Sequence, residues 1–249
     1  MWGTDMDTVA GPLPAERMAQ AVRRALLLGI LLDLALIGGR VLLYTPFLAQ
    51  RNSLGYVLEP VALLLVYAGV VRAVTAGADP RRRIALRTGL LVGVLTGALW
   101  IVNLTLETFA DLPSGAGFLT SAPFLLGAFA LWGVAAGRGA RQTGSLRLGV
   151  LAALWAALIC VLIAITFGLL LAYTSLPRLE HTLVTDPDYL RSHWQDLRAF
   201  AIANQFDAAA SHLLIAPVVA VLVGLVGGLV STGWVRLRRR RAAWVSRGG

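Results

Sequence analysis

The 249-residue chain is 57% hydrophobic and only 14% charged, and its mean hydropathy is +0.74. Because soluble domains carry about 25% charged residues, such a chain has too little polar surface to cover a fold in water, and the composition excludes an ordinary soluble domain. The net charge is +9 and every basic residue is an arginine. These arginines flank apolar runs, so they indicate membrane topology and we expect no nucleic-acid partner.

Six apolar segments are each long enough to cross a lipid bilayer as a helix, which requires about 20 residues. They comprise residues 24–46, 57–76, 84–108, 117–137, 147–173 and 207–235. We therefore expect an all-α integral membrane protein, a bundle of six transmembrane helices over residues 24–235. A segment 1–23 precedes the bundle and a basic tail 236–249 follows it.

The arginines predict the orientation of these spans, because cytoplasmic loops are enriched in basic residues. If both termini are cytoplasmic, seventeen arginines lie inside and four outside, and most acidic residues lie outside. Only an even number of spans places every loop on the side of the membrane that its arginine content predicts. The absence of lysine, with heavy use of alanine, glycine and arginine, is typical of a GC-rich bacterial genome. We therefore expect a bacterial plasma (inner) membrane protein with both termini in the cytoplasm.

Asp33 and Arg40 are the polar residues of the first span. Asp33 lies about 13 Å along a helix from Arg24, close to the bilayer midplane. An ionisable group at that depth is costly, so it is either paired inside the bundle or serves a function in a hydrated cavity. Arg40 shares its helical face and lies about 10 Å farther along, too far for direct contact.

The even spans share a proline near their expected outer ends, at Pro60, Pro123 and Pro217. Proline is tolerated in a first helical turn, where its missing N–H is not needed. The pattern is consistent with three related hairpins, and equally with the ordinary use of proline at helix starts. Pro217 lies about ten residues into its span, so it marks either a kink or the true start of the helix.

Two spans carry small residues at every fourth position. These are Gly89, Gly93 and Gly97 in the third span, and Ala216, Ala220, Gly224 and Gly228 in the sixth. In lipid, small faces allow helix backbones to approach closely and so mark helix contacts. The spacing favours packing within the bundle, but it also allows a homo-oligomer or partner membrane subunits.

A second polar group is expected in the outer leaflet and consists of Glu59, Asn103, Glu107 and His212. Asn103 and Glu107 share a helical face. His212 continues the four-residue row of Ala216, so it should point into the bundle. Together with Arg40 they would line an outward-facing pocket for an ion, a proton or a small polar substrate. Alternatively, the two glutamates mark helix ends in headgroup water, with Arg40 as counter-ion.

The loop 174–206 is the only sizeable segment between spans. Asp186-Pro187-Asp188 is a typical helix start, and apolar residues follow at helical spacing. We predict one short amphipathic helix, about 187–204, on the outer surface of the membrane or bundle. It would be either a passive interfacial helix or a lid. In the tail, Arg238–Arg241 would hold the C-terminus inside and offers a site for anionic lipid.

The sequence contains no HExxH zinc motif, no GxSxG elbow and no phosphate-binding P-loop. We therefore expect no metal and no cofactor, and the sequence leans away from an enzyme. The first functional hypothesis is a transport component for a small solute or ion. The alternatives are a non-catalytic scaffold or accessory subunit, and then an intramembrane enzyme. In size and number of spans the chain broadly resembles ABC exporter permeases and the substrate-capture subunits of vitamin transporters, without any shared motif.

Overall fold

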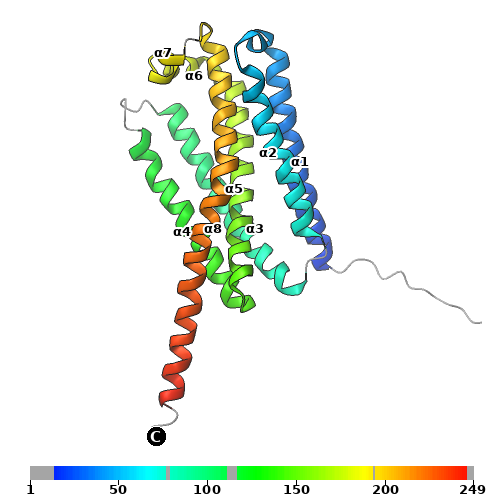
Figure 1. Cartoon of the computed structure of the whole chain (residues 1–249), viewed down its shortest axis with the longest axis vertical. Coiled ribbons are helices and arrows are strands. Elements are labelled where there is room, and N and C mark those ends of the chain that lie inside the picture. The colour runs from blue at the N-terminus through cyan, green and yellow to red at the C-terminus, as the bar shows by residue number, and fades with distance from the viewer. Residues whose placement is uncertain (1–13, 77–78, 111–116, 193, 246–249) are drawn as a thin grey trace, which may run out of the picture.

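All described elements of the chain are helices, and most of them run side by side (Figure 1). The computed structural model describes residues 14–76, 79–110, 117–192 and 194–245, and the side chains of residues 20–76, 79–110, 119–192 and 194–233. The helices are α1 (Pro14–Leu43), the 3-10 helix η1 (Thr45–Ala49), α2 (Ser53–Thr75), α3 (Pro80–Phe109), α4 (Gly117–Thr143), α5 (Leu146–Thr174), α6 (Leu176–Leu183), α7 (Pro187–Ser192) and α8 (Leu197–Val245). The side chains of Arg238–Arg241, the predicted lipid site in the tail, lie outside the described residues.

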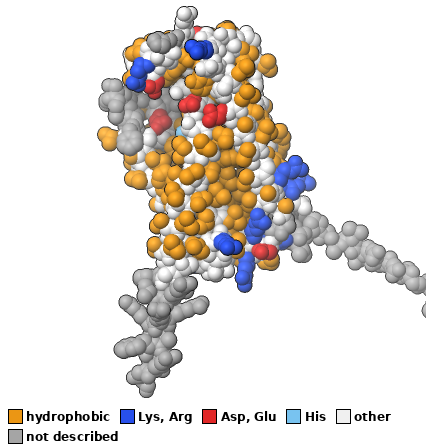
Figure 2. Space-filling view, in the orientation of Figure 1, with side chains coloured by type: hydrophobic (Ala, Val, Ile, Leu, Met, Phe, Trp, Pro, Cys, Tyr) orange, Lys and Arg blue, Asp and Glu red, His pale blue; other side chains and the backbone are white. Residues whose placement is uncertain are grey.

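Six of these helices are long and apolar enough to cross a membrane: α1, α2, α3, α4, α5 and α8. This confirms the predicted all-helical fold with six candidate spans. Large apolar side chains are exposed along them, for example Leu65 on α2 and Val226 on α8. Figure 2 shows these side chains as a broad hydrophobic band between the two ends of the bundle. Such a surface is consistent with contact to lipid.

The predicted amphipathic helix over residues 187–204 is wrong, because two helices share this range. α7 ends at Ser192 and α8 begins at Leu197. The carboxylate of Asp196 accepts hydrogen bonds from the backbone N–H groups of Arg198 and Ala199, at 2.9 and 3.1 Å. This is the bonding of a helix N-cap, so a new helix starts there. The apolar residues after Leu197 therefore belong to the sixth span, which begins ten residues earlier than expected.

α5 is the central helix of the bundle and contacts α1, α3, α4 and α8. In its most apolar window 67% of the residues are buried, compared with 17–28% in the other candidate spans. Its buried face is rich in small residues, including Gly149, Ala152, Ala153 and Ala156. A helix that is apolar on all sides is expected at the centre of a bundle, because every face then meets another helix.

The small residues of α3 lie against α5 at very close range. A methyl group added to Gly89 would lie 2.6 Å from the carbonyl oxygen of Ala152. The same group on Gly93 would lie 2.7 Å from the oxygen of Ala156. Gly97 instead faces the side chain of Ile163 of α5, with Cδ1 at 2.7 Å from an added methyl group. None of these three positions has room for a side chain. The backbones of α3 and α5 can lie this close together only because these residues are glycine.

The small residues of α8 pack against α5 and α4. Ala216 and Ala220 are buried, a methyl group on Gly224 would lie 3.1 Å from Ala153 Cβ, and one on Gly228 would overlap Leu146. The sequence pattern did not single out Gly227, which faces the backbone of Gly133 on α4. The described small faces are thus used for packing within one chain.

Pro60 and Pro123 do not lie in first helical turns, contrary to prediction. α2 begins at Ser53 and α4 at Gly117, so Pro60 is the eighth residue of its helix and Pro123 the seventh. Pro217 lies deep inside α8, so of its two predicted roles the start of the helix is wrong.

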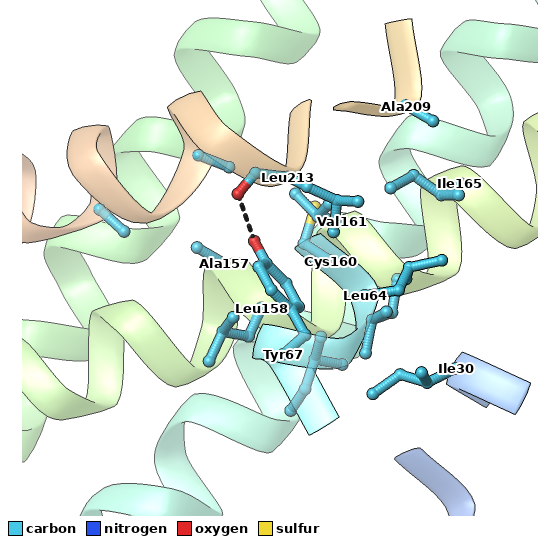
Figure 3. Packing of buried hydrophobic residues seen from close by; sticks show 14 of the residues in the cluster. Ile30, Leu64, Tyr67, Ala157, Leu158, Cys160, Val161, Ile165, Ala209 and Leu213 are labelled. Atoms are coloured by element: carbon cyan, nitrogen blue, oxygen red, sulfur yellow. Dashed lines mark hydrogen bonds between the residues drawn. The ribbon is translucent and has the colours of Figure 1, made fainter. Parts of the chain in front are cut away.

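An interior proline cannot donate to the carbonyl four residues earlier, which for Pro217 is the carbonyl of Leu213. The hydroxyl of Tyr67 on α2 donates to this oxygen at 2.8 Å (Figure 3). The proline thus frees a buried acceptor that a neighbouring helix satisfies.

The two ends of the bundle differ in composition. The arginine end comprises the start of α3, the end of α4 and the start of α5, with Arg81–Arg83, Arg87, Arg138, Arg141 and Arg147. The loop end carries η1, α6, α7 and the start of α8. Figure 2 shows most of the visible acidic side chains near the loop end.

Substitution of Gly93 by alanine should destabilise the protein in detergent by about 1–3 kcal/mol, because the added methyl group overpacks the α3–α5 contact. Gly69 on α2 is the matched control, since a methyl group there has no heavy atom within 4 Å and alanine favours a helix over glycine. Thermal unfolding of both variants provides the measurement. Equal melting temperatures for the Gly93→Ala and Gly69→Ala variants would contradict the close contact.

A double-mutant cycle tests the bond between Tyr67 and Leu213. Tyr67→Phe should cost about 1 kcal/mol in the unmodified chain, because the carbonyl of Leu213 loses its donor. In a Pro217→Ala background the backbone N–H of residue 217 serves that carbonyl, so the cost should be clearly smaller. The free energy of unfolding of the four proteins gives the coupling. Strict additivity would show that the proline and the hydroxyl do not share this oxygen.

Candidate functional site

Asp33 is the only fully buried carboxylate among the described side chains. It lies near the middle of the candidate span Gln20–Leu43, and its side chain is 0% exposed. Thr166 of α5 donates to its Oδ1 atom at 2.7 Å. Its Oδ2 atom has no hydrogen-bond partner among the described residues. A buried carboxylate with one neutral partner is costly when ionised, and such groups in membrane-spanning segments are usually functional.

The Thr166 hydroxyl has two acceptors within reach and a single proton. Besides Asp33 Oδ1 it lies 2.8 Å from the carbonyl oxygen of Leu162, one turn earlier in α5. When Asp33 is ionised, Thr166 donates to the carboxylate. When Asp33 is protonated, its own O–H can donate to Thr166, and the hydroxyl can turn to Leu162. The pair therefore accommodates both protonation states of Asp33 without a change of backbone.

Thr166 also lines an open apolar groove between α1 and α3, with α5 as its floor. The groove has a volume of about 460 Å³, and its walls include Leu26 and Gly29 of α1 and Leu90 and Val94 of α3. Asp33 itself does not line it. Thr166 therefore adjoins both the groove and the carboxyl group of Asp33.

Arg40 lies nearer the loop end and has its own partners on α5. Its Nη2 atom donates to the carbonyl oxygen of Ala172 at 3.1 Å, and its guanidinium carbon lies 5.1 Å from the centre of the Tyr173 ring. Because α5 ends at Thr174, the carbonyl of Ala172 is one of the last four, which have no helical donor. Arg40 thus caps the C-terminus of α5, where a cation is favoured. The adjacent cavity, about 10 Å³, is no larger than one water molecule.

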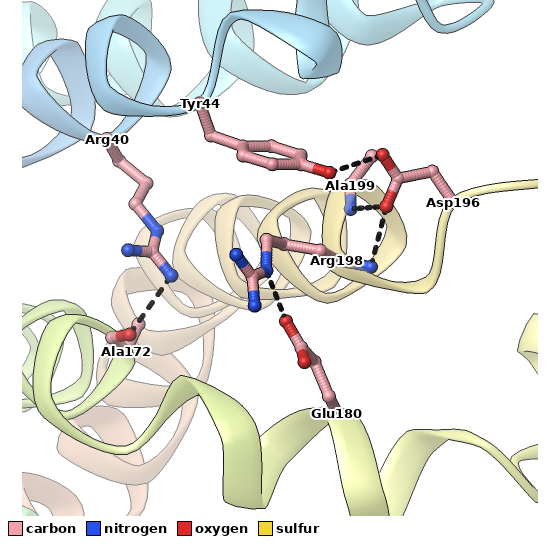
Figure 4. A network of polar contacts seen from close by, with 7 residues as sticks. All are labelled: Arg40, Tyr44, Ala172, Glu180, Asp196, Arg198 and Ala199. Carbon is pink, nitrogen blue, oxygen red and sulfur yellow. Dashed lines mark hydrogen bonds and ion pairs between the residues drawn. The ribbon is translucent and has the colours of Figure 1, made fainter.

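A network of polar contacts joins α1, α6 and α8 beside Arg40 (Figure 4). Tyr44 donates to the free oxygen of the Asp196 cap at 2.5 Å, and Arg198 donates to Glu180 of α6 at 2.6 Å. The hydrogen bond to Asp196 is the main cause that raises the pKa of Tyr44 above its ordinary value. The network fixes the start of α8 to the end of α1. No sequence pattern indicated this network, because Asp186 and not Asp196 was expected as the helix cap.

The other predicted site residues do not form one pocket. Asn103 is buried and donates to Glu107 at 3.0 Å, and Ser121 of α4 also donates to Glu107. Glu59 is exposed on α2. His212 is exposed rather than buried, its ring meets the ring of Trp100 at 5.5 Å, and Leu213 occupies the inward position. The expectation that His212 points into the bundle is therefore wrong.

Comparisons of the chain with protein-family models, with curated proteins and with solved structures found no match. Within the described ranges, no three histidine, cysteine, aspartate or glutamate side chains gather where they would hold a metal ion. The candidate site is therefore defined by its own geometry, the Asp33–Thr166 pair in the centre of the bundle.

Tyr44→Phe should destabilise the protein by about 1 kcal/mol near neutral pH, because the Asp196 cap loses one hydrogen bond. The pKa of Tyr44 is raised in the fold, so the contribution is complete below about pH 10, the unfolded value. It is lost as the pH rises through the folded value. Thermal unfolding of both proteins from pH 7 upward should show the difference vanish at alkaline pH. Tyr189→Phe is the control, since the Tyr189 hydroxyl has no hydrogen bond within the described ranges; an equal loss there would contradict the assignment.

Proposed function

We propose that the chain is a membrane transport component that moves a small solute or ion, and that Asp33 is its proton-binding group. The observation that carries the proposal is the fully buried Asp33, bonded to Thr166 through one oxygen and without a partner at the other. A purely structural carboxylate in the middle of an apolar bundle would be expected to have a cationic partner or several donors.

The geometry favours a proton over a larger ligand at this position. The carboxyl group is enclosed, and its neighbour Thr166 exchanges one hydrogen bond for another when Asp33 gains or loses a proton. Proton relays in membrane transporters are commonly built on acidic side chains such as this one. Thr166 also lines the adjoining groove, so the hydrogen-bond partner of Asp33 reaches the surface of the bundle.

The distribution of arginine supports a placement in the membrane. We propose that the arginine end faces the cytoplasm, so that both termini are cytoplasmic and the loop end faces outward. The composition of the chain supports a bacterial plasma membrane. Anionic lipid on the cytoplasmic side would attract the basic segment Arg238–Arg241.

Proton flux into proteoliposomes tests the role of Asp33. The purified chain is reconstituted with an enclosed pH-sensitive dye, and a potassium diffusion potential drives protons inward. We expect the unmodified chain to acidify the lumen faster than protein-free liposomes. Asp33→Asn should reduce this rate at least tenfold, because an amide cannot carry the proton, and Thr166→Val should reduce it less.

Glu59→Gln is the matched control, because it also neutralises a carboxylate of the spans but at an exposed position. It should leave the flux unchanged. Thermal unfolding shows whether each variant is folded. A rate for folded Asp33→Asn equal to that of Glu59→Gln would refute the proposed role of Asp33, and flux no faster than in empty liposomes would refute proton movement by the chain alone.

The second candidate function is an accessory subunit of a larger membrane complex. The groove between α1, α3 and α5 favours this function, because it has a volume of about 460 Å³, is lined by apolar side chains and is open at the surface. A transmembrane helix of a partner would fill such a groove. If the chain is an accessory subunit, Val94→Trp on the wall should dissociate the complex and Asp33→Asn should not. If the chain is a transport component, Asp33→Asn should reduce proton flux more than Val94→Trp does.

A further inference from the structure

A second groove lies between α3 and α4 at the arginine end, away from Asp33. Its volume is about 610 Å³, within the range of about 300–1,000 Å³ that small ligands occupy. The polar residues of its lining are Arg87 and Thr88 of α3 and Arg138 and Gln142 of α4. Thr88 lies 3.4 Å from the Gln142 side-chain oxygen, a contact that joins the two walls.

The groove changes from charged to apolar along its length. On α3, Leu91 follows Arg87 by one helical turn, about 6 Å deeper into the bundle. On α4, which runs the opposite way, Val134 lies one turn deeper than Arg138. Leu91 is 63% exposed and Val134 is 57% exposed, so this apolar half opens to the outside. Both walls thus place an arginine toward the end of the bundle and an aliphatic side chain toward its middle.

The two arginines of the groove lack a negative partner within the described part of the chain. Neither guanidinium has a hydrogen bond or ion pair there. α4 and α5 contain no acidic residue, and the single one of α3 is Glu107, near the opposite end. Asp79, just before α3, accepts a hydrogen bond from the backbone of Arg82. Two like charges on facing walls call for an anion between them.

We propose that this groove binds an anionic phospholipid, with the phosphate between Arg87 and Arg138 and the start of an acyl chain along Leu91 and Val134. The charge and the apolar half together select this occupant. A soluble phosphate would use only the arginines, whereas a lipid also covers the exposed aliphatic side chains. The proposal involves other residues than the predicted lipid site Arg238–Arg241, and it does not depend on the proposed function of Asp33.

The test measures the binding of phosphatidylglycerol to the purified full chain. Native mass spectrometry of the detergent-solubilised protein counts bound lipid as phosphatidylglycerol or phosphatidylcholine is added. We expect retained phosphatidylglycerol and little phosphatidylcholine. Arg87→Gln with Arg138→Gln should weaken phosphatidylglycerol binding about 30-fold, from the usual contribution of two basic residues near a membrane surface. Val134→Trp, which fills the apolar half without a change of charge, should also weaken it.

The control is Arg81→Gln with Arg147→Gln, which removes the same charge from exposed positions at the same end but outside the groove. This variant should bind phosphatidylglycerol like the unmodified chain. Melting temperatures without added lipid verify that each variant is folded. The proposal is overturned if the control variant loses as much lipid as the groove variant, if Val134→Trp has no effect, or if inorganic phosphate displaces the lipid at equal concentration.

Discussion

The structure depends on how closely α3, α4 and α8 approach α5. Lipid offers helices little hydrophobic drive to associate, so packing and buried hydrogen bonds must hold them together. Gly89 and Gly93 bring the α3 backbone to the carbonyl oxygens of α5, and Gly224 brings α8 to Ala153 on the same helix. α5 can accept three neighbours at this range because its own buried face consists largely of alanine and glycine. Its central position follows from this composition.

A close-packed apolar bundle leaves few polar groups, and each needs a partner within the protein. The carbonyl of Leu213, which Pro217 deprives of its helical donor, is satisfied by Tyr67 from α2. The carbonyl of Ala172, at the end of α5, is satisfied by Arg40 from α1. In both cases the side chain that completes a helix comes from another helix. These bonds therefore join elements as well as satisfy the backbone.

The sequence predicts those features that depend on one helix at a time. The six spans follow from the lengths of the apolar runs, and the small-residue row of α3 marks the helix face that meets α5. His212 was misplaced because a row of every fourth residue turns by about 40° at each step, so it leaves the buried face before reaching position 212. The partners of Asp33 and Leu213 come from distant parts of the chain, and no local pattern indicates them. Arg87 and Arg138 were counted only as markers of topology, because their shared groove exists only in three dimensions.

Asp33 differs from the other predicted polar residues, because the structure explains the position of each of those. Arg40 caps a helix, Asn103 and Glu107 bond to each other, and Glu59 and His212 are exposed, so each has an ordinary structural explanation. Asp33 has no such explanation, since Thr166 would be bonded equally well to Leu162 without it. An apolar residue of similar size at position 33 would remove a buried, unpaired oxygen and should stabilise the bundle. That a costly carboxyl group occupies the position instead is the physical reason for the proposed role of Asp33.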